Sequence, residues 1–430
     1  MERRREVMIV AAASLAGALT RLLAISKTAW DWDEALFMLA LRHYDVVAHH
    51  PHPPGFPLFI FFAKGIAALG VDDFRALQAI VVASSMLIVP AAYSFARALK
   101  LEFATSLTAA ILLAFFPNVW FYGGTAFSDV PSMVLVVAAC ALLLHERTYF
   151  LGALLLGFAC GMRPQNLLIG FAPLLLGARR DLRRVIAAAA IVAVVVVTSY
   201  GAAAQLSGGW REYADAIARH QRYIRETDSV FSPIRPPIYR SFDDFYIRPY
   251  AGPLIYVPLT LFVLAGLVRV KRHAVLLATF APFALFAWLM LDRFSVSRFS
   301  IGYAPLMAIL AADGIALVAR RAAPAIAAVL VAIMIVWTSP SLTIVRTTES
   351  PTYAAAMWIR AHYDLRTTSI DADDRVRAFA DYWLTDAARD AKHVVVMREG
   401  VLPNAQVFAR PHEPLWRLVR QRYFEISVVP

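Results

Sequence analysis

The chain has 430 residues, of which 60% are hydrophobic and only 17% are charged, and its mean hydropathy is +0.58. Soluble globular domains carry about 25% charged residues, so this composition excludes an ordinary soluble protein. The net charge of +11 does not indicate nucleic-acid binding, because the basic residues form short clusters between apolar runs, as they do in the cytoplasmic loops of membrane proteins.

Apolar segments recur along residues 1–345 at or near the roughly 20 residues that a membrane-spanning helix needs. They predict about eleven transmembrane helices, at 7–25, 76–97, 103–122, 129–145, 148–162, 164–178, 183–204, 251–269, 273–291, 298–318 and 322–342. Met1–Glu6 is basic, and Leu22–Trp32 lacks a small-residue cleavage site, so the first segment is predicted to be an uncleaved span. Cys140 and Cys160 lie inside apolar segments and are predicted to be buried structural thiols.

The basic clusters predict the orientation of the spans. If the spans alternate, these clusters all fall on one side, which is then cytoplasmic: Arg3–Arg5, Arg97 and Lys100, Arg147, Arg179–Arg184, Arg269–Arg272, and Arg320 with Arg321. We therefore expect an integral protein of a bacterial inner membrane, with the N-terminus in the cytoplasm and the C-terminus outside. Phe56–Gly70 is short, follows three prolines and contains Lys64, which favours a re-entrant or interfacial helix; a full span is the alternative.

Three regions are expected outside the membrane: loops 26–75 and 205–250, and the tail 346–430. In the second loop, Trp210–Ile224 has an apolar face and predicts a helix on the membrane surface, which either braces the structure or contacts substrate. The tail is polar and mixes strand-like and helical patterns, which predicts a small α/β extracytoplasmic domain. The strand-like runs are His393–Met397 and Glu425–Val429, and the helical runs are Tyr353–Tyr363 and Arg375–Ala387.

Carboxylates gather at two external points. Trp30–Glu34 carries three acids at a membrane exit, which is costly unless they are solvated or used. Asp129 opens a later span on the same side. Both points have a structural alternative: Asp31 or Asp33 could cap a helix through Leu36–Leu41, and Ser128 or Asp129 could cap the later span.

Histidines and arginines accompany these acids. His49, His50 and His52 lie in a proline-rich turn and could bind a divalent metal, although their spacing shows no closed ligand set; contacts with backbone or phosphate are the alternative. Arg163, Arg293 and Arg298 fall on the same external side, where arginine can bind phosphate through paired hydrogen bonds or extend to lipid headgroups. Acids and arginines on one membrane face favour an anionic, lipid-linked substrate.

In their order, these motifs resemble the membrane-embedded GT-C glycosyltransferases, in particular the protein O-mannosyltransferases and the bacterial aminoarabinose and related lipid-sugar transferases. The resemblance covers roughly Met8–Val318. It rests on Asp33-Glu34 after the first span, His52-Pro53-Pro54, Asp129 at a later span, and Arg298-Phe299 before Ala304-Pro305-Leu306. It implies an all-α polytopic GT-C fold, here with a small C-terminal α/β domain.

The resemblance also implies an activity: transfer of a sugar from a polyprenyl-phosphate donor to a lipid, glycan or protein acceptor outside the cytoplasm, with inversion. It implies Asp33 as catalytic base, Glu34 as the residue that places the acceptor, and Asp129 in the same cavity. Arginines are expected at the donor phosphate, namely Arg298, Arg293 and Arg163, and His50 and His52 are expected in the acceptor loop. No cofactor is required by this chemistry, while a divalent metal at His50 and His52 remains open.

Other classes of membrane protein stay open as alternatives. A transporter or lipid flippase places ionisable residues near mid-membrane, whereas most charges here lie at span ends, with Lys64 and Asp313 as exceptions. An O-antigen ligase or polymerase also uses lipid-linked sugars, but the early Asp-Glu motif favours a monosaccharide transferase. A non-catalytic scaffold is disfavoured by the clustered acids and arginines. The sequence leaves the sugar and the acceptor undefined.

Overall fold

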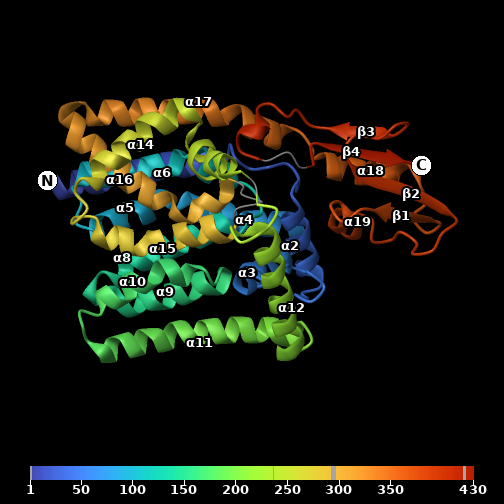
Figure 1. Ribbon diagram of the computed structural model, residues 1–430, viewed down its shortest axis with the longest axis horizontal. Helices are drawn as coiled ribbons and strands as arrows, with labels where there is room; N and C mark the ends of the chain where they lie inside the picture. Colours follow the sequence, from blue (N-terminus) through green and yellow to red (C-terminus); the bar gives the residue numbers. More distant parts are fainter. Residues whose placement is uncertain (1, 236, 292–296, 420–422) are drawn as a thin grey trace.

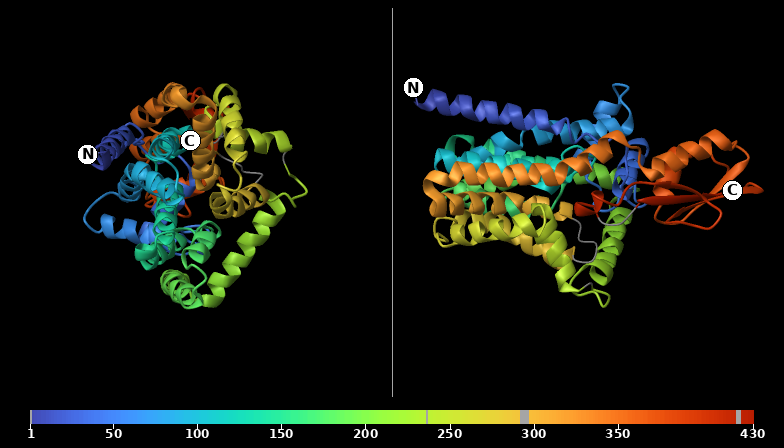
Figure 2. Two further views of the ribbon diagram at one scale, coloured as in Figure 1. Left: turned by 90° about the vertical axis from the view of Figure 1, so that its left-hand side faces the viewer. Right: turned by 90° about the horizontal axis from the view of Figure 1, so that it is seen from above.

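The computed structural model describes residues 2–235, 237–291, 297–419 and 423–430. Long helices run side by side in a bundle, and a small sheet lies beyond one end of it (Figure 1). The N-terminus lies at the opposite end of the bundle from the sheet, as the right-hand view of Figure 2 also shows. The N-terminus and the C-terminal sheet are therefore separated by the length of the helical bundle.

Helices account for most of the chain before the sheet. The first group comprises α1 (Glu2–Arg21), α2 (Trp32–Arg42), α3 (Pro57–Ala67), α4 (Asp73–Met86), α5 (Ile88–Ala98), α6 (Phe103–Phe115), α7 (Pro117–Tyr122), α8 (Asp129–Leu143), α9 (Tyr149–Met162), α10 (Asn166–Gly177) and α11 (Leu182–Leu206). The second group comprises α12 (Trp210–Tyr223), α13 (Ile238–Phe242), α14 (Pro253–Leu267), α15 (Ala274–Met290), α16 (Ala304–Ala319) and α17 (Ala323–Thr347). Helices thus occupy all of the predicted spans, and the amphipathic helix predicted at 210–224 is α12.

Judged by length and composition, fewer helices can cross a membrane than the sequence predicts. Among the described residues, α11 and the run Ser297–His362 are each long and apolar enough to cross a membrane; counting each bent helix pair as one span gives up to four. Two predicted spans are interrupted: α4 and α5 meet at a bend of 43°, and Pro117 begins α7 directly after α6. Proline lacks the N–H that would continue the hydrogen bonds of α6. The expected count of about eleven is therefore not confirmed.

Close backbone contact holds α14 against α16. A Cβ on Gly314 would overlap the carbonyl of Phe262, and a Cβ on Gly266 would overlap that of Leu310, so only glycine permits this approach. Asp313 of α16 is buried and contacts three basic side chains that follow α14, namely Arg269 at 3.3 Å, Arg272 at 3.3 Å and His273 at 3.0 Å. This network ties the two helices together, which is the structural role expected of an acid paired inside an apolar bundle.

The two cysteines lie inside the bundle. Cys140 of α8 and Cys160 of α9 are both free and buried. This confirms the expected structural thiols. By contrast, α11 exposes large apolar side chains along its length, with Ile186, Val194 and Val197 each at least 60% exposed. Such a surface is stable only against an apolar environment, so this face suits contact with lipid.

The C-terminal segment forms a four-stranded sheet in the order β1-β2-β4-β3. Its strands are β1 (Thr368–Ala372), β2 (His393–Glu399), β3 (Gln406–Ala409) and β4 (Glu425–Val429), and its helices are α18 (Pro351–His362) and α19 (Arg377–Trp383). β1 and β2 are parallel, whereas β4 pairs antiparallel with both β2 and β3. The strands predicted at 393–397 and 425–429 are confirmed, while β1 and β3 were not predicted.

Polar contacts fix this sheet to the helical bundle. Arg410 is buried and donates to the carbonyls of Thr348 at 2.6 Å and Glu349 at 2.8 Å. Tyr382 of α19 donates its hydroxyl to Asp73 of α4 at 2.7 Å, and the Arg42 guanidinium lies 3.8 Å from the centre of the Tyr382 ring. The C-terminal segment therefore has a defined position against α2 and α4.

The chain after α1 is tied to the turn that precedes α8. The backbone N–H of Ser26 donates to the carbonyl of Gly124 at 3.0 Å, and Gln78 Nε2 donates to the same oxygen at 2.7 Å. A Cβ on Gly124 would overlap the carbonyl of Ala24. This contact sets the distance between the segments that carry Asp33 and Asp129.

We expect the substitution Gly124→Ala to lower the free energy of unfolding by about 3 kcal/mol, because the added methyl group must push the two backbones apart. The measurement is thermal unfolding of the detergent-solubilised protein. Gly65→Ala is the matched control: nothing lies within 4 Å of its Cβ position. Within α3 it should be neutral or stabilise by about 0.5–1 kcal/mol. Equal unfolding temperatures for Gly124→Ala and the wild type would contradict the close approach.

Candidate active site

The three carboxylates of the motif Trp30–Glu34 make different contacts. Asp31 is the N-cap of α2 and accepts from the backbone N–H of Asp33 at 3.0 Å. Glu34 completes the capping box and accepts from the N–H groups of Trp30 at 2.8 Å and Asp31 at 3.2 Å. Its second oxygen accepts from Ala126 N–H at 2.9 Å. Asp33 is therefore the member of the motif that is not committed to these backbone contacts.

The structure places Glu34 away from the role that the family resemblance implies. Its side chain is fully buried, and it does not line the cavity described below. Burial raises the pKa of Glu34 to about 7, and the three backbone N–H donors act in the opposite direction. Its contacts join the start of α2 to the turn before α8, which is a positioning role rather than contact with an acceptor.

Asp33 forms an ion pair with Arg298, from the short helix Ser297–Tyr303 (η5) that precedes α16. Both side chains are largely buried, at 14% and 13% exposure. The other carboxylate oxygen lies 3.6 Å from Nδ1 of His52. Burial by itself would raise the pKa of Asp33, but the positive charge of Arg298 outweighs it and holds the pKa well below its usual range. Asp33 is therefore ionised at neutral pH.

A second ion pair joins Asp129, at the start of α8, to Arg163, which directly follows α9. Neither Ser128 nor Asp129 caps α8 with its side chain. The capping alternative therefore does not account for Asp129. Both arginines also lie against aromatic rings: Arg298 is 4.4 Å from the centre of Phe127, and Arg163 is 5.5 Å from the centre of Phe56. These rings orient the guanidinium groups.

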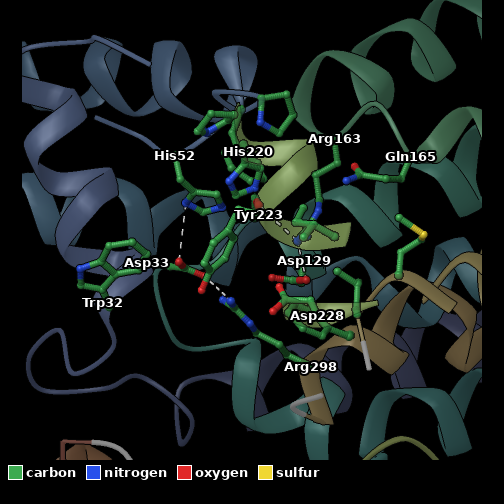
Figure 3. Close-up of a pocket in the computed structure, with 18 of the residues that line it drawn as sticks. Trp32, Asp33, His52, Asp129, Arg163, Gln165, His220, Tyr223, Asp228 and Arg298 are labelled. Atoms are coloured by element: carbon green, nitrogen blue, oxygen red, sulfur yellow. Dashed lines mark hydrogen bonds and ion pairs between the residues drawn. The ribbon is translucent and has the colours of Figure 1, made fainter. Parts of the chain in front are cut away.

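Both pairs line one cavity of about 2050 Å³ (Figure 3). Typical ligand sites measure about 300–1,000 Å³, so this cavity has room for a substrate in more than one part. One region of its wall is apolar and includes Phe286, Met290 and Phe299. The segment after β1 also contributes, through Asp374 and Arg375. The cavity thus lies where the helical bundle, α12 and the C-terminal sheet meet.

The two predicted loop histidines do not come together. His52 lines the cavity, where it packs on the rings of Phe37 and Phe56, and burial lowers its pKa to about 4. His50 does not line it; its backbone pairs with that of Asp45. Within the described ranges, no group of three or more His, Cys, Asp or Glu side chains is arranged to hold a metal ion.

The remaining predicted residues can now be placed. The cavity brings together five of them, Asp33, His52, Asp129, Arg163 and Arg298. Glu34 and His50 lie outside its lining. Arg293 falls among residues 292–296, outside the described part of the chain.

Most of the lining residues were not predicted from the sequence, and two of them, His220 and Tyr223, lie on α12. His220 and Tyr223 extend from α12 into the cavity, and both are labelled in Figure 3. Their three-residue spacing places them on one side of a helix. The amphipathic pattern predicted this helix, but it does not show which of its polar side chains meet other parts of the chain.

The placement of Glu34 predicts the effect of Glu34→Gln. Glutamine has one acceptor oxygen and an NH₂ group, so at least one of the three N–H donors loses its partner, and stability should fall by about 1–3 kcal/mol. Thermal unfolding in detergent measures this, with the exposed Glu212→Gln as control. A Glu34→Gln variant with unchanged stability and no turnover would instead assign Glu34 to the chemistry.

Comparisons with known proteins extend these observations. No protein-family model matches the chain, and no curated protein matches it in sequence. The structure matches the crystal structure of ArnT from Cupriavidus metallidurans bound to undecaprenyl phosphate, with a TM-score of 0.58, 12% identity, and coverage of 98% of this chain and 97% of that chain. The apo structure of the same protein gives a TM-score of 0.61 and 12% identity over 100% and 98% of the two chains.

A third structure is the S. cerevisiae protein O-mannosyltransferase Pmt1–Pmt2 complex bound to the sugar donor. It covers 55% of this chain and 36% of that chain at 16% identity, and its TM-score of 0.36 gives no support to a shared fold. The match to ArnT, at 12% identity, concerns the fold alone. Over nearly its whole length, the chain has the GT-C fold seen in the ArnT structures, which confirms the fold that the motif resemblance implies.

Proposed function

We propose that this protein is an inverting glycosyltransferase that moves a sugar from a polyprenyl-phosphate donor to an acceptor hydroxyl on the extracytoplasmic face. The observation that carries the proposal is the Asp33–Arg298 ion pair in the wall of the large cavity. It places a carboxylate that can accept a proton beside a guanidinium that can hold a phosphate. The GT-C fold shared with ArnT supports this assignment.

A lipid-linked phosphate suits the donor end of the cavity. ArnT of the same fold has been crystallised with undecaprenyl phosphate. In this chain, Arg298 and Arg163 supply guanidinium groups, and the apolar lining from Phe286, Met290 and Phe299 suits a hydrocarbon chain next to them. Arginine binds phosphate oxygens through paired N–H donors, so these side chains would fix the phosphate and stabilise the charge that develops on it.

The reaction that we propose is a single displacement. The acceptor oxygen attacks the anomeric carbon of the sugar from the face opposite the phosphate. The bond between that carbon and the phosphate oxygen breaks, its electron pair stays with the phosphate, and the acceptor proton goes to Asp33. The products are the glycosylated acceptor and the polyprenyl phosphate. A phosphate anion leaves readily, so the reaction needs no strong general acid, and attack from the opposite face inverts the anomeric carbon.

The ion pair with Arg298 also controls how readily Asp33 accepts a proton. In the structure Arg298 depresses the pKa of Asp33, and a weakly basic carboxylate removes protons slowly. A donor phosphate that takes up N–H groups of Arg298 adds negative charge near Asp33 and weakens the arginine's hold on it. Its proton affinity therefore rises once the donor is bound. Binding of the donor would in this way prepare the base for the acceptor.

Asp129 and Arg163 would complete the site from the other side of the cavity. Their ion pair brings a second carboxylate within the same lining as Asp33. We propose that Asp129 holds the acceptor while Arg163 adds to phosphate binding. The acceptor is a lipid, glycan or protein, and no cofactor is needed for the displacement. We further propose a bacterial inner-membrane location, with the cytoplasmic N-terminus and the extracytoplasmic C-terminal segment at the two ends of the bundle.

The first test replaces the base. Asp33→Asn should lower turnover by about 10²–10⁴-fold, because asparagine cannot accept the proton, while binding of the donor should persist. The assay incubates purified protein with a panel of undecaprenyl-phosphate sugars and lipid or glycan acceptors, and determines the anomeric configuration of the product. Asp215→Asn, on the exposed face of α12 and outside the cavity lining, is the control. Full activity of Asp33→Asn, or retention of configuration, would contradict the proposal.

The second test uses the pH dependence of kcat/KM, which reports the free enzyme. Asp33 is ionised down to low pH in the wild type, so its acidic limb should lie below about pH 4. Arg298→Gln removes the charge that depresses the pKa of Asp33, and burial then raises it. The acidic limb should therefore move to higher pH. Arg163→Gln should cause a smaller shift, since its charge has less influence on Asp33. An unchanged acidic limb in Arg298→Gln would exclude Asp33 as the titrating base.

A further inference from the structure

Tyr223 presents an aromatic ring to the cavity next to the proposed reaction centre. It is the last residue of α12 and lines the same cavity as Asp33 and Asp129. Figure 3 shows its ring pointing into the space bounded by Asp33, His52 and His220. Tyr223 is 48% exposed. A large, open aromatic face is therefore available to a ligand.

A row of rings connects Tyr223 with the carboxylate of Asp33. The Tyr223 and His220 rings are stacked, with centroids 6.3 Å apart and an interplanar angle of 22°. The His220 centroid is 5.9 Å from that of His52, and His52 Nδ1 is 3.6 Å from Asp33 Oδ1. A ligand that reacts near Asp33 and extends toward α12 would meet this row directly.

The position of α12 is fixed by contacts with the turn that carries His52. Tyr213 is buried and donates its hydroxyl to the carbonyl of Pro54 at 2.7 Å, and Ala216 is also buried. The helix therefore holds His220 and Tyr223 in a defined place relative to the acid. Among the other exposed aromatic residues of this loop, Trp210 and Tyr239 are 60% and 73% exposed and do not line the cavity, whereas Phe231, at 72% exposure, does line it. Trp210 and Tyr239 suit the membrane interface, where exposed aromatic residues gather.

A sugar ring matches this wall chemically. One face of a pyranose or furanose ring carries mainly C–H groups, and such a face can pack on an aromatic ring through dispersion and weak C–H contacts. The hydroxyl groups at the ring edge need polar partners. Burial lowers the pKa of His220 to about 4, so its imidazole is neutral at pH 7 and offers one N–H donor and one acceptor nitrogen.

We propose, as an extension of the proposed function, that Tyr223 and His220 form the subsite for the transferred sugar. The sugar ring packs on the face of Tyr223, and a ring hydroxyl binds His220, so that the anomeric carbon lies between Asp33 and the donor phosphate. This subsite takes the hexose or pentose of the donor rather than its lipid or phosphate. The aromatic face, and not the tyrosine hydroxyl, provides most of the sugar binding.

The test compares binding of undecaprenyl phosphate with binding of undecaprenyl-phosphate hexoses and pentoses, by calorimetry on the full-length protein in detergent. Tyr223→Leu should weaken binding of the preferred sugar-bearing lipid about 10-fold and leave binding of the bare lipid phosphate unchanged, since only stacking is lost. Tyr223→Phe keeps the ring and should stay within about 3-fold of the wild type. Tyr239→Leu, outside the cavity lining, is the matched control and should change neither affinity.

Several results would overturn the subsite. These are equal weakening of both lipids by Tyr223→Leu, equal losses in Tyr223→Phe and Tyr223→Leu, an unchanged affinity in Tyr223→Leu, or a wild type that binds sugar-bearing and bare lipids equally well. The outcome is separable from that of the proposed function. A wild type that transfers sugar while Tyr223→Leu binds the donor normally would refute the subsite alone. A wild type that needs Tyr223 to recognise the sugar but transfers it to no acceptor would refute the transferase alone.

Discussion

An aspartate and an arginine 265 positions apart in the sequence meet in the wall of one cavity, and the arrangement of the site depends on this contact. A largely buried charge without a partner costs several kcal/mol, so Asp33 and Arg298 each require the other. Their pairing fixes the start of α2 against the short helix before α16. The capping box of α2 and the Glu34 contacts with the turn before α8 then hold Asp33 at its place from the other side.

In the reaction that we propose, the same contact gives the site its chemistry. A carboxylate stored as an ion pair is ionised before substrate arrives, and the phosphate of the donor competes for the arginine that restrains it. Asp129 and Arg163 form a second pair of this kind in the lining of the same cavity. The proposed anionic donor would therefore meet cations already oriented by the rings of Phe127 and Phe56. The rings of His52, His220 and Tyr223 extend the site from this charged centre toward α12.

Sequence patterns predicted the helical fold, α12, two of the four strands and five of the residues that line the cavity. They succeeded where periodicity or motif order decides the structure. Glu34 shows their limit: an acid three positions after an N-cap can serve the capping box or the cavity, and only the fold shows which contacts it makes. The span count is not confirmed, and hydropathy did not register the break at Pro117 or the bend between α4 and α5. His220 and Tyr223 were missed because helical periodicity identifies an apolar face but not the distant loop that a polar side chain meets.

A cryo-electron microscopy structure of the protein with bound undecaprenyl phosphate tests the central claim most directly. The account predicts that the phosphate oxygens bind the Arg298 guanidinium within about 3 Å. It also predicts that the Asp33 carboxylate faces the space beside the phosphate where the anomeric carbon would lie. A phosphate bound outside this cavity, or an Asp33 carboxylate directed away from it, would contradict the account.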